Sequence, residues 1–302
     1  MRTTTRAARG RTWHGAGSAA DASGGTQEPQ RDPRWDPQWI VPRWPIPREV
    51  RALITTRAGG YSTGRFGSVT GQGGLNLGRG GPPAGTQGSQ DEKDPAVMRN
   101  RERLREALPG APLWLHQVHG ARVIDAALAA ASAAGGAAPQ ADASFTTSVG
   151  VVCAVLTADC LPVLLADVQG RGVAAAHAGW RGLAAGVIQN AVHALRQAVG
   201  DSQARILAYL GPAIGPQHFE VGPEVLEAMR QGLPRAQEAF APGAAGRYRA
   251  DLFALARQAL EQAGVTQVFG EELCTASDPV RFFSFRRDRV TGRQAALIWR
   301  ET

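Results

Sequence analysis

The chain of 302 residues is poor in several residue types, and each scarcity excludes a class of protein. Lysine occurs once, at Lys93, so arginine supplies almost all of the basic charge. The net charge of +7 then reflects composition rather than a nucleic-acid-binding stripe. Three cysteines are too few for a disulfide framework, and an odd number of thiols indicates a reducing, cytoplasmic compartment. No apolar run approaches the roughly 18 residues of a membrane helix. The sequence therefore predicts a cytoplasmic protein that binds neither nucleic acid nor membranes.

Two common catalytic motifs are also absent. The chain contains no glycine-rich phosphate cradle of the P-loop type and no Gly-x-Ser-x-Gly nucleophile elbow. Any chemistry must therefore come from a different arrangement of side chains.

Composition divides the chain into an extension and one domain. Residues 1–34 are rich in Gly, Ala, Ser, Thr and Arg without hydrophobic periodicity, which predicts a disordered N-terminal extension; an organelle transit peptide is the alternative. Residues 35–302 mix strand-length apolar runs with amphipathic stretches. Strands are expected at 50–56, 123–126, 149–156, 161–166, 173–176 and 206–210. Helices are expected at 95–108, opened by Asp94-Pro95, at 183–199, at 223–231 and at 252–263, with Asp251 as the N-cap of the last. A hairpin is expected to join 282–287 to 294–299. Without regular βα alternation, this predicts an α+β fold: one domain of mixed β-sheets covered by helices.

Three short segments, 115–120, 157–162 and 176–182, each offer a candidate metal ligand. Two imidazoles and one thiolate suit zinc, and three protein ligands leave the fourth tetrahedral position open for catalysis. His116 and His119 would face opposite sides of a strand, so only one is expected to bind; His119, beside Gly120, is chosen. Cys160 and His177 complete the set, with His116 outside it.

Each of these residues also has a structural interpretation. Most free cysteines are small buried hydrophobes, but the polar interruption around Cys160 between two apolar runs favours a functional thiol, whereas Cys153 lies within a run and is expected in the core. Arg181 follows His177 where a helix begins and could bind phosphate or carboxylate, or simply face solvent. The turn after the first strand could place Arg57 in a pocket as well.

The chain resembles the YfiH/PgeF family, also called laccase-domain or multicopper polyphenol oxidase proteins. The resemblance rests on a series of motifs in the same order: Thr-Thr-Arg-Ala-Gly-Gly at 55–60, Leu-Asn-Leu-Gly at 75–78, Asn-Arg at 100–101, Gln-Val-His-Gly at 117–120, Ala-Asp-Cys-Leu-Pro at 158–162, the segment 176–182, Gly-Pro-Ala-Ile-Gly at 211–215 and 283–287. It implies that His119, Cys160 and His177 bind zinc, with copper the less favoured metal. It also implies a YfiH-like α+β domain.

The resemblance further implies a zinc-dependent purine nucleoside phosphorylase. Such an enzyme would cleave adenosine, inosine, guanosine or methylthioadenosine with phosphate and would also deaminate adenosine. Arg57, Asn76 and Arg181 are the expected substrate- or phosphate-binding residues. Asp159 is the candidate acid or base, and His116 is a candidate proton donor near N7 of the purine.

Other functions remain open. Some family members are described as peptidoglycan editing factors, and Cys160 with His177 as base would suit a cysteine hydrolase acting on mis-charged cell-wall precursors. A non-enzymatic zinc-stabilised binding module is a third candidate. Six histidines are too few for several copper centres, which argues against a multicopper oxidase.

Overall fold

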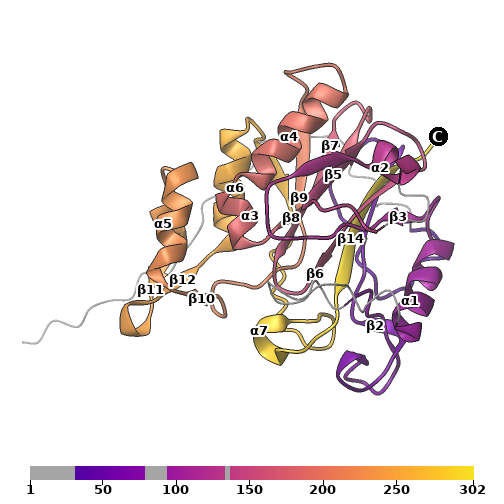
Figure 1. Cartoon of the computed structure of the whole chain (residues 1–302), viewed down its shortest axis with the longest axis horizontal. Coiled ribbons are helices and arrows are strands. Elements are labelled where there is room, and N and C mark those ends of the chain that lie inside the picture. Colours follow the sequence, from indigo (N-terminus) through magenta and orange to yellow (C-terminus); the bar gives the residue numbers. More distant parts are fainter. Residues whose placement is uncertain (1–30, 79–93, 133–136) are drawn as a thin grey trace, which may run out of the picture.

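The computed structural model describes residues 31–78, 94–132 and 137–302. Two β-sheets stack face to face, with helices covering the outer face of each (Figure 1). This architecture confirms the predicted α+β fold with mixed sheets and helices. The described part of the predicted extension, 31–34, forms a turn in which Trp35 N–H donates to the Asp32 carbonyl; residues 1–30 and the glycine-rich stretch 79–93 lie outside the described residues.

The sheets combine strands that are distant in sequence. The four-stranded sheet has the order β1 (Val50–Ile54), β14 (Gln294–Arg300), β6 (Val152–Thr157) and β3 (Pro112–Leu113). The six-stranded sheet has the order β13 (Gln267–Phe269), β9 (Ile206–Leu210), β7 (Leu161–Asp167), β8 (Val173–Ala178), β5 (Ala143–Thr146) and β4 (Val123–Asp125). A small third sheet has the order β10 (Glu220–Val221), β12 (Tyr248–Ala250) and β11 (Phe240–Pro242), and β2 (Ala58–Ser62) lies outside all three.

Alternation of side chains along each strand explains the layers. In β14, Ala296 and Ile298 face the six-stranded sheet, whereas Leu297 and Trp299 face the opposite side. Because both faces are covered, such strands are almost entirely apolar rather than alternating in polarity. The central core therefore lies between the two sheets.

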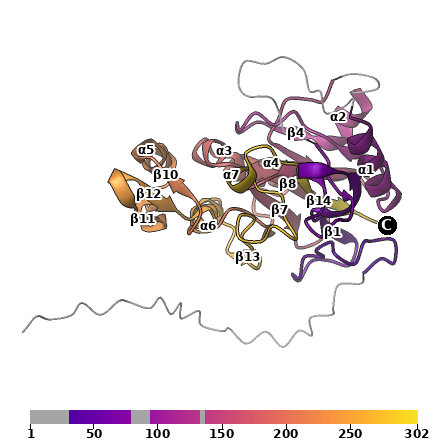
Figure 2. The same cartoon turned by 90° about the horizontal axis from the view of Figure 1, so that it is seen from below.

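The helices enclose this pair of sheets from outside. Helices α3 (Trp180–Ala184), α4 (Val187–Ala198) and α6 (Leu252–Gln262) cover the six-stranded sheet, and α1 (Pro95–Glu106) lies on the far side (Figure 1). Helix α5 (Pro223–Gly232) forms a lobe with the three-stranded sheet (Figure 2). The remaining helices are α2 (Ala126–Ser132), α7 (Phe285–Asp288) and the 3₁₀ segments η1 (Gly64–Phe66), η3 (Ala236–Ala239) and η4 (Ala244–Gly246). None of the described helices is long and apolar enough to cross a membrane.

Local signals gave several boundaries correctly. Asp94 and Asp251 cap α1 and α6, each accepting from backbone amides of the first turn. The helix expected at 183–199 is interrupted at Gly186, whose φ of +84° separates α3 from α4.

The expected C-terminal hairpin is wrong. The first arm, 282–287, contains helix α7 instead of a strand, and β14 pairs with β1 and β6. Ser284 caps α7 by accepting from Arg287 N–H, a local alternative to strand pairing.

Candidate metal site

Two of the three proposed ligands are placed by neighbouring strands. Cys160 immediately precedes β7, and His177 is the penultimate residue of β8. These strands are antiparallel, with Pro162 paired to His177 and Leu161 to Ala178, so the register brings Cys160 to the same end as His177. The third ligand, His119, lies in a loop with φ of +60°.

The three side chains converge at this end of the sheet. The candidate ligand atoms of His119, Cys160 and His177 all lie within 4.8 Å of one another. Zinc–sulfur and zinc–nitrogen bonds of about 2.3 and 2.0 Å in a tetrahedron place two donor atoms roughly 3.5 Å apart. Cys160 Sγ and His119 Nε2 are 3.8 Å apart, so the donor set fits a zinc-sized ion. His177 is buried and His119 is exposed, which leaves the site accessible from one side.

Asp142 organises the site, and the sequence pattern did not identify it as a functional residue. Its carboxylate accepts from the amides of Val118, His119 and Gly120 and lies 2.9 Å from Nδ1 of His177. The only sequence signal available was a lone acidic residue at the start of the small-residue strand β5. Its contacts with 118–120 and His177 depend on tertiary structure.

Gly179 gives the ligands their space. A Cβ at this position would lie 2.9 Å from Cys160 Sγ and 2.9 Å from His119 Cδ2. The backbone at Gly179 has φ of −66° and ψ of 159°, which any residue adopts. Space rather than conformation therefore requires glycine here.

Asp159 is held by other loops. Its φ is +94°, and its carboxylate accepts from Thr275 Oγ1 at 2.6 Å and from Arg286 N–H at 2.6 Å. These bonds fix the turn that carries Cys160. Each oxygen of the Asp159 carboxylate therefore already accepts one hydrogen bond.

The electrostatics of Cys160 and His177 are coupled. Burial opposes ionisation of the Cys160 thiol, but the neighbouring His177 and His119 outweigh it and lower the pKa of Cys160 to about 6. Burial also opposes protonation of His177, yet the Cys160 thiolate and Asp142 raise its pKa to about 9. The site therefore favours a thiolate, the form of cysteine that binds metals and attacks electrophiles.

The exposed candidates lie close to the ligands in sequence. Arg181 is exposed at the start of α3, two residues beyond Gly179, and its guanidinium lies 4.3 Å from the Trp180 ring centroid. His116 is exposed, and its backbone pairs with Gln140 through a parallel bridge. The structure therefore leaves both side chains accessible to a ligand.

Arg57 and Asn76 are buried instead. Arg57 donates to the carbonyls of Gly67 and Arg65 and stacks 5.0 Å from the Phe283 ring centroid. Burial lowers the pKa of Arg57, although Asp288 opposes this effect. Asn76 Oδ1 accepts from the amides of Gly78 and Arg293, while its buried Nδ2 has no hydrogen-bond partner among the described atoms.

Strand pairing nevertheless places Arg57 and Asn76 at the same end of the four-stranded sheet as the turn to Cys160. Thr55 donates its amide to Ala295, and Gln294 pairs with Thr157, where β6 ends and the turn to Cys160 begins. Arg57 and Asn76 thus lie at the end of the four-stranded sheet from which the Cys160 turn departs.

The other two cysteines differ from Cys160. Cys153 is fully buried in β6, as predicted, and burial raises the pKa of its thiol to about 12. Cys274 Sγ accepts from Gly215 N–H at 3.2 Å and therefore has a local structural partner.

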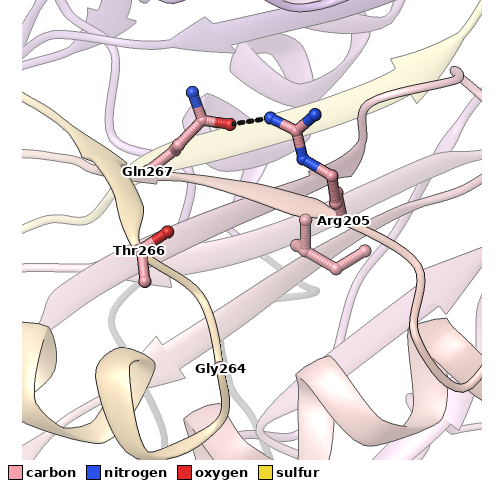
Figure 3. Close-up of a pocket in the computed structure, with 5 residues that line it drawn as sticks. Arg205, Gly264, Thr266 and Gln267 are labelled. Atoms are coloured by element: carbon pink, nitrogen blue, oxygen red, sulfur yellow. Dashed lines mark hydrogen bonds between the residues drawn. The ribbon is translucent and has the colours of Figure 1, made fainter. Parts of the chain in front are cut away.

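A separate hollow lies away from these ligands. It encloses about 240 Å³ and is lined by Arg205, Ile206, Gly264, Thr266 and Gln267 (Figure 3). Ile206 pairs with Asp167, at the opposite end of β7 from Cys160. The hollow therefore lies at the opposite end of the six-stranded sheet from the candidate ligands.

Fold and site together define an α+β protein with an open, three-donor candidate metal site. Residues 51–301 match the family model described as multi-copper polyphenol oxidoreductase laccase. The chain belongs to this family.

Relatives with curated names refine that assignment. A Pseudomonas aeruginosa protein named purine nucleoside phosphorylase is 46% identical over 263 residues, covering 86% of this chain and 98% of the relative. The Escherichia coli purine nucleoside phosphorylase YfiH is 45% identical over 262 residues, with the same coverage. These relatives support an enzyme of that kind and confirm the YfiH resemblance.

A solved structure supports the fold independently. A Neisseria meningitidis protein superposes with a TM-score of 0.73 at 43% identity, covering 88% of this chain and all of the other. YlmD from Geobacillus stearothermophilus gives a TM-score of 0.71 at 31% identity.

Proposed function

We propose that this chain is a zinc-dependent purine nucleoside phosphorylase that also deaminates adenosine. It would take adenosine, inosine, guanosine or methylthioadenosine with phosphate and release the base and ribose 1-phosphate. The observation that carries the proposal is the convergence of His119, Cys160 and His177 at one end of the six-stranded sheet. The names of the relatives supply the substrate class.

Zinc is proposed over copper because of the donor set. Two imidazoles and a thiolate suit zinc, and among the described residues no other group of three His, Cys, Asp or Glu side chains converges in this way. A laccase needs several copper centres, for which the three histidines outside the site segments are too few. When bound, zinc would supply Lewis acidity to a phosphate, ribose or water oxygen.

The chain's own residues would bind and orient the substrates. Arg181 is the proposed phosphate contact, because it is exposed in the first turn of α3, two residues beyond Gly179. Gly179 itself lies against Cys160 and His119. His116 is proposed to donate a proton to the departing base near N7. Arg57 and Asn76 would support the substrate wall from the adjacent end of the four-stranded sheet. Among the described residues, the buried Nδ2 of Asn76 has no hydrogen-bond partner.

Turnover of adenosine and inosine, with and without phosphate, tests the proposal. The zinc-loaded protein should form ribose 1-phosphate only when phosphate is present, and it should convert adenosine to inosine without it. Arg181→Ala should raise the KM for phosphate more than that for nucleoside. Failure of every nucleoside to react would refute the proposal.

A peptidoglycan editing hydrolase is the second candidate function. The observation in its favour is the Cys160 thiol, whose lowered pKa beside His177 resembles that of an activated nucleophile. Metal removal and Cys160→Ser separate the two functions. Activity that survives complete zinc removal but is lost in Cys160→Ser would favour the thiol nucleophile.

A further inference from the structure

We propose that Asp142 is the positioning residue that sets the geometry of both imidazole ligands of the candidate metal site. The inference rests on the proposed zinc site but not on which substrate is turned over. A single buried carboxylate would thereby couple the loop carrying His119 to the ring of His177.

Hydrogen bonds from two directions meet on Asp142, which is fully buried. Oδ2 accepts from Val118 N–H at 3.1 Å and Gly120 N–H at 2.7 Å, and Oδ1 accepts from His119 N–H at 2.9 Å. These three consecutive amides hold His119 at a φ of +60°, a conformation that non-glycine residues seldom adopt. The carboxylate therefore stabilises the turn that presents His119.

The same carboxylate orients the other histidine. Oδ1 lies 2.9 Å from His177 Nδ1, and the Asp142 carbonyl accepts from His177 N–H at 2.7 Å. An ionised carboxylate can only accept, so Nδ1 must carry a proton, and Nε2 is the ring nitrogen left to bind a metal. Because Oδ1 is shared by the His119 amide and the His177 ring, a shift at one ligand is transmitted to the other.

Asparagine cannot replace this acceptor set. An amide has one oxygen and an NH₂ group, and at position 142 that NH₂ group would face either the amides of the 118–120 turn or the His177 Nδ1–H. Asp142→Asn would therefore misplace His119 or release His177 to the other tautomer, although the side chain keeps its size.

Asp167 offers a matched control. It is also a fully buried carboxylate, but it binds Arg171 at 2.7 Å at the opposite end of β7 from Cys160. Asp167→Asn thus removes the charge of a fully buried carboxylate without touching the candidate ligands.

Competition with a chromogenic chelator measures the zinc affinity of each full-length variant. Loss of such an outer-shell partner typically weakens metal affinity about 10- to 100-fold, and we expect this for Asp142→Asn with less than about a threefold change for Asp167→Asn. Equal affinities for wild type and Asp142→Asn, or equal losses in both variants, would overturn the inference.

A measurement on the wild-type protein covers the case in which Asp142→Asn does not fold. Nitrogen-15 NMR of the imidazoles should show His177 protonated at Nδ1 in zinc-loaded protein. The chemical shift of its Nε2 should change when the metal binds. A proton on Nε2 would overturn the inference. Neither measurement depends on turnover. If the wild type binds zinc and the two variants differ in zinc affinity as expected, but no phosphorolysis occurs, only the proposed function is refuted.

Discussion

Substitution of Gly179 by alanine tests whether the ligands share the tight space that the structure shows. The new Cβ would lie 2.9 Å from both Cys160 Sγ and His119 Cδ2. Ordinary contact between such atoms is roughly 3.5–4.0 Å, so one or both ligands must move by more than about 0.5 Å. Metal sites tolerate deviations of about 0.2 Å in bond length, so zinc affinity should fall at least about tenfold.

Gly179→Ala should lower the free energy of unfolding, whereas the same substitution in open space would raise it. The backbone at Gly179 suits alanine, and such a substitution in open space stabilises a protein by about 0.4–1 kcal/mol. Overpacking costs roughly 1–3 kcal/mol, which leaves a net loss of about 0–2.6 kcal/mol. Urea unfolding of the metal-free variant measures this loss separately from zinc binding.

Gly120→Ala is the control for this prediction. Its Cβ would meet Asp142 Oδ2 at 3.5 Å and Val118 Cγ2 at 3.7 Å, which are ordinary contacts, and its amide would still bind Asp142. Zinc affinity should remain near that of wild type. If Gly179→Ala binds zinc as tightly as Gly120→Ala, the proposed crowding of Cys160 and His119 is refuted.

Three further predictions concern acid stability, thiol reactivity and the core. Burial opposes ionisation of Asp167, but hydrogen bonds from Arg171 outweigh it and lower its pKa. The stability that Asp167 provides is therefore present above the unfolded pKa of about 3.9 and is lost as pH falls through its folded pKa. In urea titrations, the difference in unfolding free energy between wild type and Asp167→Asn should shrink below about pH 4. A difference that stays constant with pH would contradict this. In metal-free protein, the rate at which iodoacetamide labels Cys160 should follow an apparent pKa of about 6, whereas Cys153, with its pKa raised to about 12, stays unlabelled. Peptide mass spectrometry that shows Cys153 labelled first would refute the site assignment. Ile298→Ala, between the two sheets, should cost about 2–5 kcal/mol of unfolding free energy, and a loss below about 1 kcal/mol would contradict its place in the core.

Local sequence signals predicted much of the fold. The capping residues Asp94 and Asp251 and the apolar runs at β7 and β9 gave element types and approximate limits, because each signal lies within a few residues of its effect. The hairpin failed because β14 pairs with strands more than 130 residues away in sequence. The local pattern of 282–299 contains no information about those partners.

The sequence likewise identified the candidate ligands of the site but not the residues that position them. Ligand chemistry identified His119, Cys160 and His177 from residue type and neighbouring glycines, and the structure brings them together. Asp142 was missed because its four contacts join segments 22 to 35 residues apart. The partners of Asp159 were missed for the same reason, since they lie more than 110 residues away.

We propose that zinc held by His119, Cys160 and His177 supports phosphorolysis of purine nucleosides. The most direct test of this proposal is a zinc titration of metal-free protein, with ribose 1-phosphate formation from inosine and phosphate measured at each step. Activity should rise linearly to a plateau at one zinc per chain, and Cys160→Ala should show no such response. Full activity in metal-free protein, or zinc-dependent activity in Cys160→Ala equal to wild type, would contradict it.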